Sequence, residues 1–168
     1  QLEVFNILKK KLINDERIKH NNLALSEIIE KKIITINKLT STSSLSEFDT
    51  SSVFLKIKNL LLRQKNEKLN SYEVTTTTID DYFEELDLSN SLLKIDVEGY
   101  ELNVLKGSKN TIKKIKFVLI ENQFFNIYKN NNEKDWHDYL MKNKFILIKK
   151  FRFPLLHFED RLYKNSLI

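Results

Sequence analysis

The apolar residues at the start of the chain recur every three or four positions, with lysines between them: Leu2, Phe5, Leu8 and Leu12. This spacing puts them on one face and predicts an amphipathic helix that ends at the polar pair 14–15. Two short apolar runs follow, separated by the charged stretch 27–32. They predict strands over 18–25 and 33–36.

A different pattern occupies the region after the second run. Residues 40–52 are dense in serine and threonine, which predicts a loop, and the apolar positions of 53–61 share one helical face. The whole of 38–72 is therefore predicted to be an insertion with a short helix, inside a single domain that covers residues 1–168.

The next segment, 72–78, ends in four threonines and favours extended structure, because β-branched side chains suit a pleated sheet. From Ile79 to Leu86 the apolar residues return to helical spacing. Two aspartates stand in the first turn of this helix, where the helix dipole favours negative charge. Thr78 is predicted to cap the helix.

The stretch that organises the chain lies at 92–107. Apolar and charged residues alternate from Leu93 to Glu98, which predicts a strand, and Gly99 permits a tight turn into a helix over 102–105. In an open α/β sheet, ligands bind beyond the carboxyl ends of the strands. The carboxylates at the end of this strand are therefore expected where a ligand binds.

The rest of the chain again alternates between the two patterns. A second helical piece is predicted after Gly107, with Ser108 as its cap and Ile112 and Ile115 on one face. The later elements are a buried strand closed by Glu121, a short helix, and two strands that pair antiparallel, the last at the sheet edge: 117–120, 136–140, 145–151 and 162–167. The alternation predicts an α/β domain with a mainly parallel sheet, covered on both faces.

Composition narrows the class of protein. The 168 residues are 41% hydrophobic, which suits one globular core, and the absence of cysteine excludes disulfides and thiolate metal sites and fits a cytoplasmic setting. The formal charge of +5 comes from basic and acidic residues that interleave, as on a solvated surface. No apolar run is long enough to span a membrane. We therefore expect neither a nucleic acid nor a membrane as a partner.

The charged face of the central strand has two interpretations. Lys94, Asp96 and Glu98 share this face, and burying a charge without a partner is costly. In the first interpretation, Lys94 pairs with Asp96 or with a neighbouring strand, and Glu98 is exposed. In the second, a carboxylate acts as a general base, positions a substrate hydroxyl or binds a metal through oxygen. Tyr100 and Glu101 form a pocket rim or, alternatively, an ordinary helix surface.

The aromatic cluster near Trp136 offers a weaker candidate for chemistry. Trp136 has helical spacing to other apolar residues and is expected in the core, which leaves His137 facing water. Nothing in the sequence supports a Ser-His-Asp or Cys-His arrangement.

The residues at 92–107, LLKIDVEGYELNVLKG, closely resemble the signature of the FkbM family of S-adenosylmethionine-dependent methyltransferases. Four further segments resemble family segments in the same order along the chain: Ala24-Leu25-Ser26, Ser43-Ser44-Leu45, Thr78-Ile79-Asp80-Asp81-Tyr82 and Val118-Leu119-Ile120-Glu121.

The resemblance implies a Rossmann-like, class I methyltransferase fold. It also implies methyl transfer from S-adenosylmethionine to an oxygen of a sugar, glycan or secondary metabolite. Asp96 is then expected to take the hydroxyl proton as catalytic base, with Glu98 positioning the acceptor. The remaining residues assigned to the acceptor are Gly99, Tyr100, Glu101 and Glu121, and those on the adenine side of the donor are Asn22 and Ala24. No metal is assigned.

One part of the family pattern has no counterpart. Both glycines lie in 92–107, so the family's first strand with its glycine-rich turn has no counterpart here. The acidic residue that holds the donor ribose has no counterpart either. We therefore expect the chain, which opens with Gln1, to be the C-terminal part of a family member, truncated at its N-terminus and catalytically incomplete. The alternatives are a non-catalytic α/β module that binds a glycan or a protein, and a basic nucleic-acid binder with salt-dependent affinity.

Overall fold

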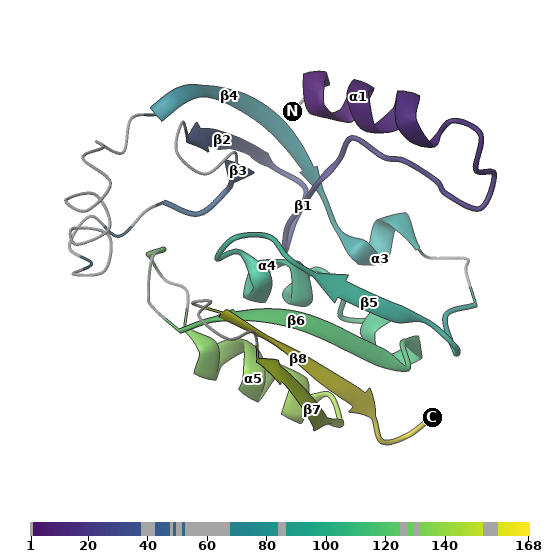
Figure 1. Cartoon of the computed structure of the whole chain (residues 1–168). Coiled ribbons are helices and arrows are strands. Elements are labelled where there is room, and N and C mark those ends of the chain that lie inside the picture. The colour runs from purple at the N-terminus through teal and green to yellow at the C-terminus, as the bar shows by residue number, and fades with distance from the viewer. Residues whose placement is uncertain are drawn as a thin grey trace.

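The computed structural model describes residues 2–37, 43–47, 49, 52, 68–83, 87–124, 128–129, 132–152 and 158–168. In this part of the chain, two four-stranded sheets are combined with α-helices (Figure 1). The helices are α1 (Leu2–Leu12), α3 (Ile79–Tyr82), α4 (Glu101–Lys106) and α5 (Glu133–Lys142), with the 3-10 turn η1 (Thr111–Lys114) after α4. The strands are β1 (Ala24–Leu25), β2 (Lys31–Asn37), β3 (Ser43–Ser44), β4 (Lys68–Thr77), β5 (Leu92–Ile95), β6 (Phe117–Gln123), β7 (Phe145–Arg152) and β8 (Phe158–Asn165).

The first sheet has the order β1-β4-β2-β3, with β1 parallel to β4 and the other neighbours antiparallel. β2 and β4 hold the β-branched runs that predicted strands, and they pair along the length of β2. The strand predicted over 18–25 is wrong except at Ala24–Leu25. Residues 18–23 include a lysine, a histidine and two asparagines, so they offer no continuous apolar face to a sheet.

The second sheet has the order β5-β6-β8-β7, with β5 parallel to β6 and β8 antiparallel to both of its neighbours. The predicted antiparallel pairing of the last two strands is confirmed, but β8 lies inside the sheet and β7 at its edge. β8 alternates between half-buried and buried positions, whereas β7 is largely exposed and rich in lysine, which suits an edge. Only β1–β4 and β5–β6 are parallel among the described pairs, so the prediction of a mainly parallel sheet is wrong there.

The hydrophobic core lies against one face of the second sheet. Ile95, Ile120 and Tyr163 pack from β5, β6 and β8 against α4 and α5. The helical members of this cluster are Val104, Leu105, Trp136 and Leu140. On the other face, Leu92 and Ile146 are 56% and 46% exposed. The described helices therefore cover one face of this sheet, and the prediction of cover on both faces is wrong for this part of the chain.

The helix α4 ties the two sheets together, and Figure 1 shows it between them. The residue after α4 passes so close to the segment after β1 that a Cβ on Gly107 would lie 2.1 Å from the Ser26 carbonyl oxygen. The Asp80 N–H donates to the Gly107 carbonyl over 3.0 Å, and the Tyr100 hydroxyl lies 3.0 Å from Ser26 Oγ. Glycine is required at 107 because a side chain has no room there.

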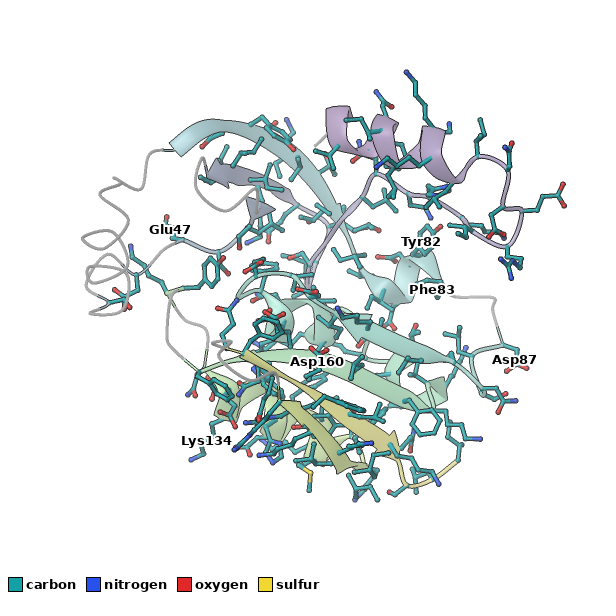
Figure 2. The ribbon with its side chains drawn as sticks, in the orientation of Figure 1. Glu47, Tyr82, Phe83, Asp87, Lys134 and Asp160 are labelled. Carbon is teal, nitrogen blue, oxygen red and sulfur yellow. The ribbon has the colours of Figure 1, made fainter. Side chains whose placement is uncertain are left out.

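The short helix α3 begins as the sequence predicts. Thr78 Oγ1 accepts the Asp81 N–H over 3.0 Å, so Thr78 is the N-cap. The rings of Tyr82 and Phe83 pack edge to face at its end, with centroids 4.7 Å apart (Figure 2). Residues 84–86 of the predicted helix lie outside the described part of the chain, as does the whole segment 53–61.

Two boundaries after α4 differ from the prediction. The Ser108 hydroxyl donates to the Leu105 carbonyl instead of capping a new helix, and only the 3-10 turn η1 follows. β6 continues past Glu121 to Gln123, because Glu121 keeps its place in the register with β8.

Among the described residues, no helix combines the length and the apolar character that crossing a membrane requires.

Candidate active site

Acidic side chains gather where the parallel strands β5 and β6 end. Ile95 and Ile120 are paired in the register and face the core, so Asp96 and Glu121, one position further, turn to the opposite face. Asp160 on β8 lies directly opposite Glu121 in the antiparallel register (Figure 2). The sequence thus places three carboxylates on one face. Asp96 lies just past the end of β5, and Glu121 and Asp160 lie within β6 and β8, near the carboxyl ends of the parallel strands, where α/β sheets bind ligands.

The first interpretation of the charged strand expects a pair between Lys94 and Asp96, and this pair is present. Lys94 Nζ lies 2.9 Å from Asp96 Oδ2, with the two side chains 50% and 41% exposed. The hydrogen bond to Asp96 is the main reason why the pKa of Lys94 is raised. Because this ion pair is solvent-exposed, it contributes little to stability.

The same interpretation expects Glu98 to be exposed, which is wrong, because Glu98 is half-buried and hydrogen-bonded. Gln123 Nε2 donates to Glu98 Oε2 over 3.0 Å, and the Tyr128 hydroxyl donates to the same oxygen over 2.9 Å. Gln123 Nε2 also lies 3.4 Å from Glu121 Oε1. The amide of Gln123 therefore links the Glu98 carboxylate to that of Glu121.

The backbone at Glu98 is bent into an unusual conformation. Glu98 has φ +54° and Gly99 has φ +87°, so two successive residues are left-handed. A side chain at Gly99 would meet the ring of Tyr128, because a Cβ there would lie 2.5 Å from the ring atoms. Non-glycine residues in this region are uncommon and often mark functional turns.

Glu121 has the electrostatics of a proton acceptor. Its pKa is raised to about 7, with burial as the largest cause and the charges of Asp96, Glu98 and Asp160 adding to it. The hydrogen bond from Gln123 acts in the opposite direction. A carboxyl group with a pKa near neutrality can both accept and release a proton at physiological pH.

Tyr100 and Glu101 do not form an ordinary helix surface, since they are only 7% and 4% exposed. Lys32 Nζ lies 5.6 Å from the centre of the Tyr100 ring. Glu101 Oε1 accepts the Gly99 N–H over 3.0 Å, and burial is the main reason why the pKa of Glu101 is raised. Glu101 therefore contacts the turn itself.

A cavity of about 290 Å³ adjoins the turn and reaches the lower end of the size range of ligand pockets. It is lined by Lys32, Leu45, Ser46, Glu47, Gly99, Tyr100, Asn103 and Lys129. Lys129 Nζ pairs with Glu47 Oε2 over 2.8 Å at its exposed rim, where Figure 2 labels Glu47. The ammonium, hydroxyl and amide groups of this lining suit a small polar ligand.

The two residues assigned to the donor lie elsewhere. Asn22 is exposed in the segment before β1, and Ala24 is half-buried on β1. Neither lines the 290 Å³ cavity or a second cavity of about 180 Å³ between α3 and η1.

The aromatic cluster around α5 is structural. Trp136 is 2% exposed, as expected of a core residue. His137, expected to face water, is half-buried, and its Nδ1 lies 2.7 Å from the hydroxyl of Tyr163. In the ranges that the structure describes, no three His, Asp or Glu side chains are grouped so that they could hold a metal ion.

Sequence reasoning missed the neutral partners of the carboxylates. Gln123 stands two positions after Glu121, so strand alternation alone could have placed both on one face. Tyr128, Ser44 and Ser46 carry no such signal, because they reach the turn from distant parts of the chain.

Carboxylates near the carboxyl ends of two parallel strands, close to a turn that lines a polar cavity, are an arrangement typical of α/β enzymes. Comparison with known families gives the class: the model of the methyltransferase FkbM domain matches residues 3–152. The chain belongs to the FkbM methyltransferase family, which confirms the resemblance of its signature. The mixed α/β structure is consistent with such a domain. No curated protein matches the chain, and no solved structure matches it either.

Proposed function

We propose that the protein methylates a hydroxyl group of a small polar acceptor, such as a sugar, a glycan or a secondary metabolite, with S-adenosylmethionine as the donor. The observation that carries this proposal is the pair Glu98 and Glu121, joined through Gln123, in a chain of the FkbM family. Gly99, the residue after Glu98, lines the polar cavity. An oxygen acceptor requires a group that takes its proton.

Glu121 is the group best suited to that step. Its raised pKa, about 7, lies near the pH at which the reaction would run, which is where a general base is most effective. The acceptor hydroxyl gives its proton to the Glu121 carboxylate, and the charge of Asp96 helps to keep the basicity of Glu121 high. Asp96 itself, which the resemblance suggested as the base, acts here on Glu121.

Glu98 has the role of orienting the acceptor. The hydrogen bonds from Gln123 and Tyr128 both reach Oε2, and they hold the carboxylate in one position. A fixed carboxylate next to the base lowers the entropic cost of placing the hydroxyl for reaction. Gly99 and Tyr100, which line the cavity, contact the rest of the acceptor in this proposal.

The residues assigned to the methyl donor are a separate pair, Asn22 and Ala24. S-adenosylmethionine supplies an activated methyl group when bound, but Asn22 and Ala24 line neither of the two described cavities. Asn22 is exposed, and the side chains around the two described cavities belong to other residues. No step of the proposed mechanism therefore runs through these two residues.

The test is methyl transfer itself. The purified protein is incubated with S-adenosylmethionine labelled in its methyl group and a panel of hydroxylated acceptors that includes sugars, oligosaccharides and phenols. The proposal expects label in at least one acceptor, in an ether bond that resists mild base. Label on carboxylates or amines, or in no acceptor while the protein binds the donor, would overturn it.

A second candidate is a non-catalytic module that binds a polar ligand in the 290 Å³ cavity, whose lining contains neither Asn22 nor Ala24. This candidate predicts that calorimetry detects an acceptor but detects no S-adenosylmethionine. Binding of both molecules would exclude it.

A further inference from the structure

The turn at 98–99 needs support from outside its own sequence. Glu98 and Gly99 are both left-handed, with φ +54° and +87°, and a left-handed non-glycine residue persists only where its surroundings hold it. On one side, Glu101 supplies such support through the Gly99 N–H. The two carbonyl groups of the turn are held by a different part of the chain.

That part is the segment 43–47, which consists of β3 and the three residues after it. Ser44 Oγ donates to the Glu98 carbonyl over 2.7 Å, and Ser46 Oγ donates to the Gly99 carbonyl over 2.7 Å. The Ser46 N–H donates to Ser44 Oγ over 2.9 Å, so the two hydroxyls belong to one hydrogen-bonded unit. Ser44 is only 3% exposed, which protects its bond from water.

The same segment also fixes the other neighbour of the Glu98 carboxylate. The Lys129 N–H donates to the Glu47 carbonyl over 2.8 Å, next to Tyr128, whose hydroxyl bonds to Glu98. Pairing of β3 with β2, with Ser44 opposite Thr35, ties the segment to the first sheet. Residues 43–47 therefore hold both the backbone that carries Glu98 and the backbone of Lys129, next to Tyr128.

We infer that Ser44 and Ser46 are positioning residues, and that the segment 43–47 clamps the turn at 98–99 so that the Glu98 carboxylate points toward the acceptor. The catalytic consequence of this inference rests on the proposed function, whereas the clamp rests on the hydrogen bonds alone. Loss of either hydroxyl leaves a carbonyl of the strained turn without its partner. The turn then relaxes and the Glu98 carboxylate moves.

The chain offers a direct readout, because Gly99 and Gly107 are its only glycines. Protein labelled with ¹³C at the carbonyl and ¹⁵N at the amide of glycine gives one Gly99 and one Gly107 signal for each nucleus. We expect Ser46→Ala to move the Gly99 carbonyl signal upfield, with Gly107 unchanged, and Ser46→Thr to restore it. The matched control is Ser91→Ala, which removes a hydroxyl bond to the Leu88 carbonyl at the far end of β5.

Kinetics separate positioning from a purely structural role. Ser44→Ala and Ser46→Ala are expected to lower kcat for methyl transfer more than they raise KM, with Ser46→Thr active and Ser91→Ala unchanged. A Gly99 carbonyl signal that stays in place in Ser46→Ala overturns the clamp. If the signal moves but kcat is unchanged, the positioning role is overturned. A wild-type protein that binds S-adenosylmethionine but transfers no methyl group contradicts the proposed function alone, since the spectra still report on the clamp.

Discussion

The hydroxyl of Tyr128 donates a 2.9 Å hydrogen bond to Glu98 Oε2, although the two residues are 30 positions apart. The ring of the same tyrosine occupies the space that a Cβ on Gly99 would need. One side chain thus holds the carboxylate through its hydroxyl and shapes the turn through its ring. These two contacts can be removed separately, and each leads to its own prediction.

Substitution of Gly99→Ala should destabilise the protein by about 1–3 kcal/mol, because it places a side chain at φ +87° and against the Tyr128 ring. Urea unfolding measures this loss. The glycine-labelled spectrum of Gly107 should keep its native position, which shows that the fold persists. An Ala variant as stable as the wild type would contradict the geometry of the turn.

Substitution of Tyr128→Phe keeps the ring and removes only the hydroxyl. Because Glu98 retains its bond from Gln123, we expect a loss of about 1–3 kcal/mol in unfolding free energy, as for one hydrogen bond to a charged group. The KM for the acceptor should rise as Glu98 becomes less fixed. If neither stability nor KM changes, the hydroxyl bond has no role in orienting the carboxylate.

The raised pKa of Glu121 predicts how stability depends on pH. The folded protein keeps a proton on Glu121 up to a pH of about 7, whereas the unfolded chain loses it near the ordinary value of 4.5. Between these values the folded state binds more protons, so this group makes stability fall as pH rises. We expect Glu121→Gln to raise Tm relative to wild type at pH 8 and to leave it nearly unchanged at pH 4. Equal shifts at both values would show that the pKa is not raised.

The buried carboxylate of Glu159 should be critical for folding. It is 0% exposed and bonded by Arg152 and Arg161, over 2.8 Å and 2.7 Å. Burial alone would raise its pKa, but these bonds outweigh burial and the pKa is lowered. Glu159→Ala removes the buried partner of Arg161, which then keeps its pair with Glu133, and should cost about 3 kcal/mol. The control Glu133→Gln, at the half-exposed partner of Arg161, should cost less than half as much in the same urea titration.

The sequence was most informative where a strong local pattern decided the structure. The order strand, turn and helix is predicted for 92–107, and it folds as β5, a left-handed turn and α4. The predicted end of the strand at Glu98 is wrong, because β5 ends at Ile95 and the turn already includes Glu98. The spacing of apolar residues also placed Trp136 in the core. These features depend on side chains within a few residues of one another, which a single sequence displays directly.

The sequence was least informative where distant segments meet. The order of β7 and β8 depends on which of them pairs with β6, a strand more than 20 residues earlier in the chain, and this pairing is not a local feature of either strand. The bond of His137 to Tyr163, and those of Ser44 and Tyr128 to Glu98, cross 26, 54 and 30 positions. Local periodicity does not predict such contacts, so the polar partners of the site are visible only in the structure.

The proposed methyl transfer depends above all on Glu121 as the proton acceptor. The most direct test is the pH dependence of the methyl-transfer rate in the wild type, in Glu121→Gln and in Glu73→Gln, which alters an exposed carboxylate on β4. We predict a wild-type rate that rises through a pKa near 7, an unchanged Glu73 variant, and a Glu121 variant slower by about 10²–10⁴-fold without this rise. A Glu121→Gln protein with the wild-type rate and pH profile would contradict the assignment.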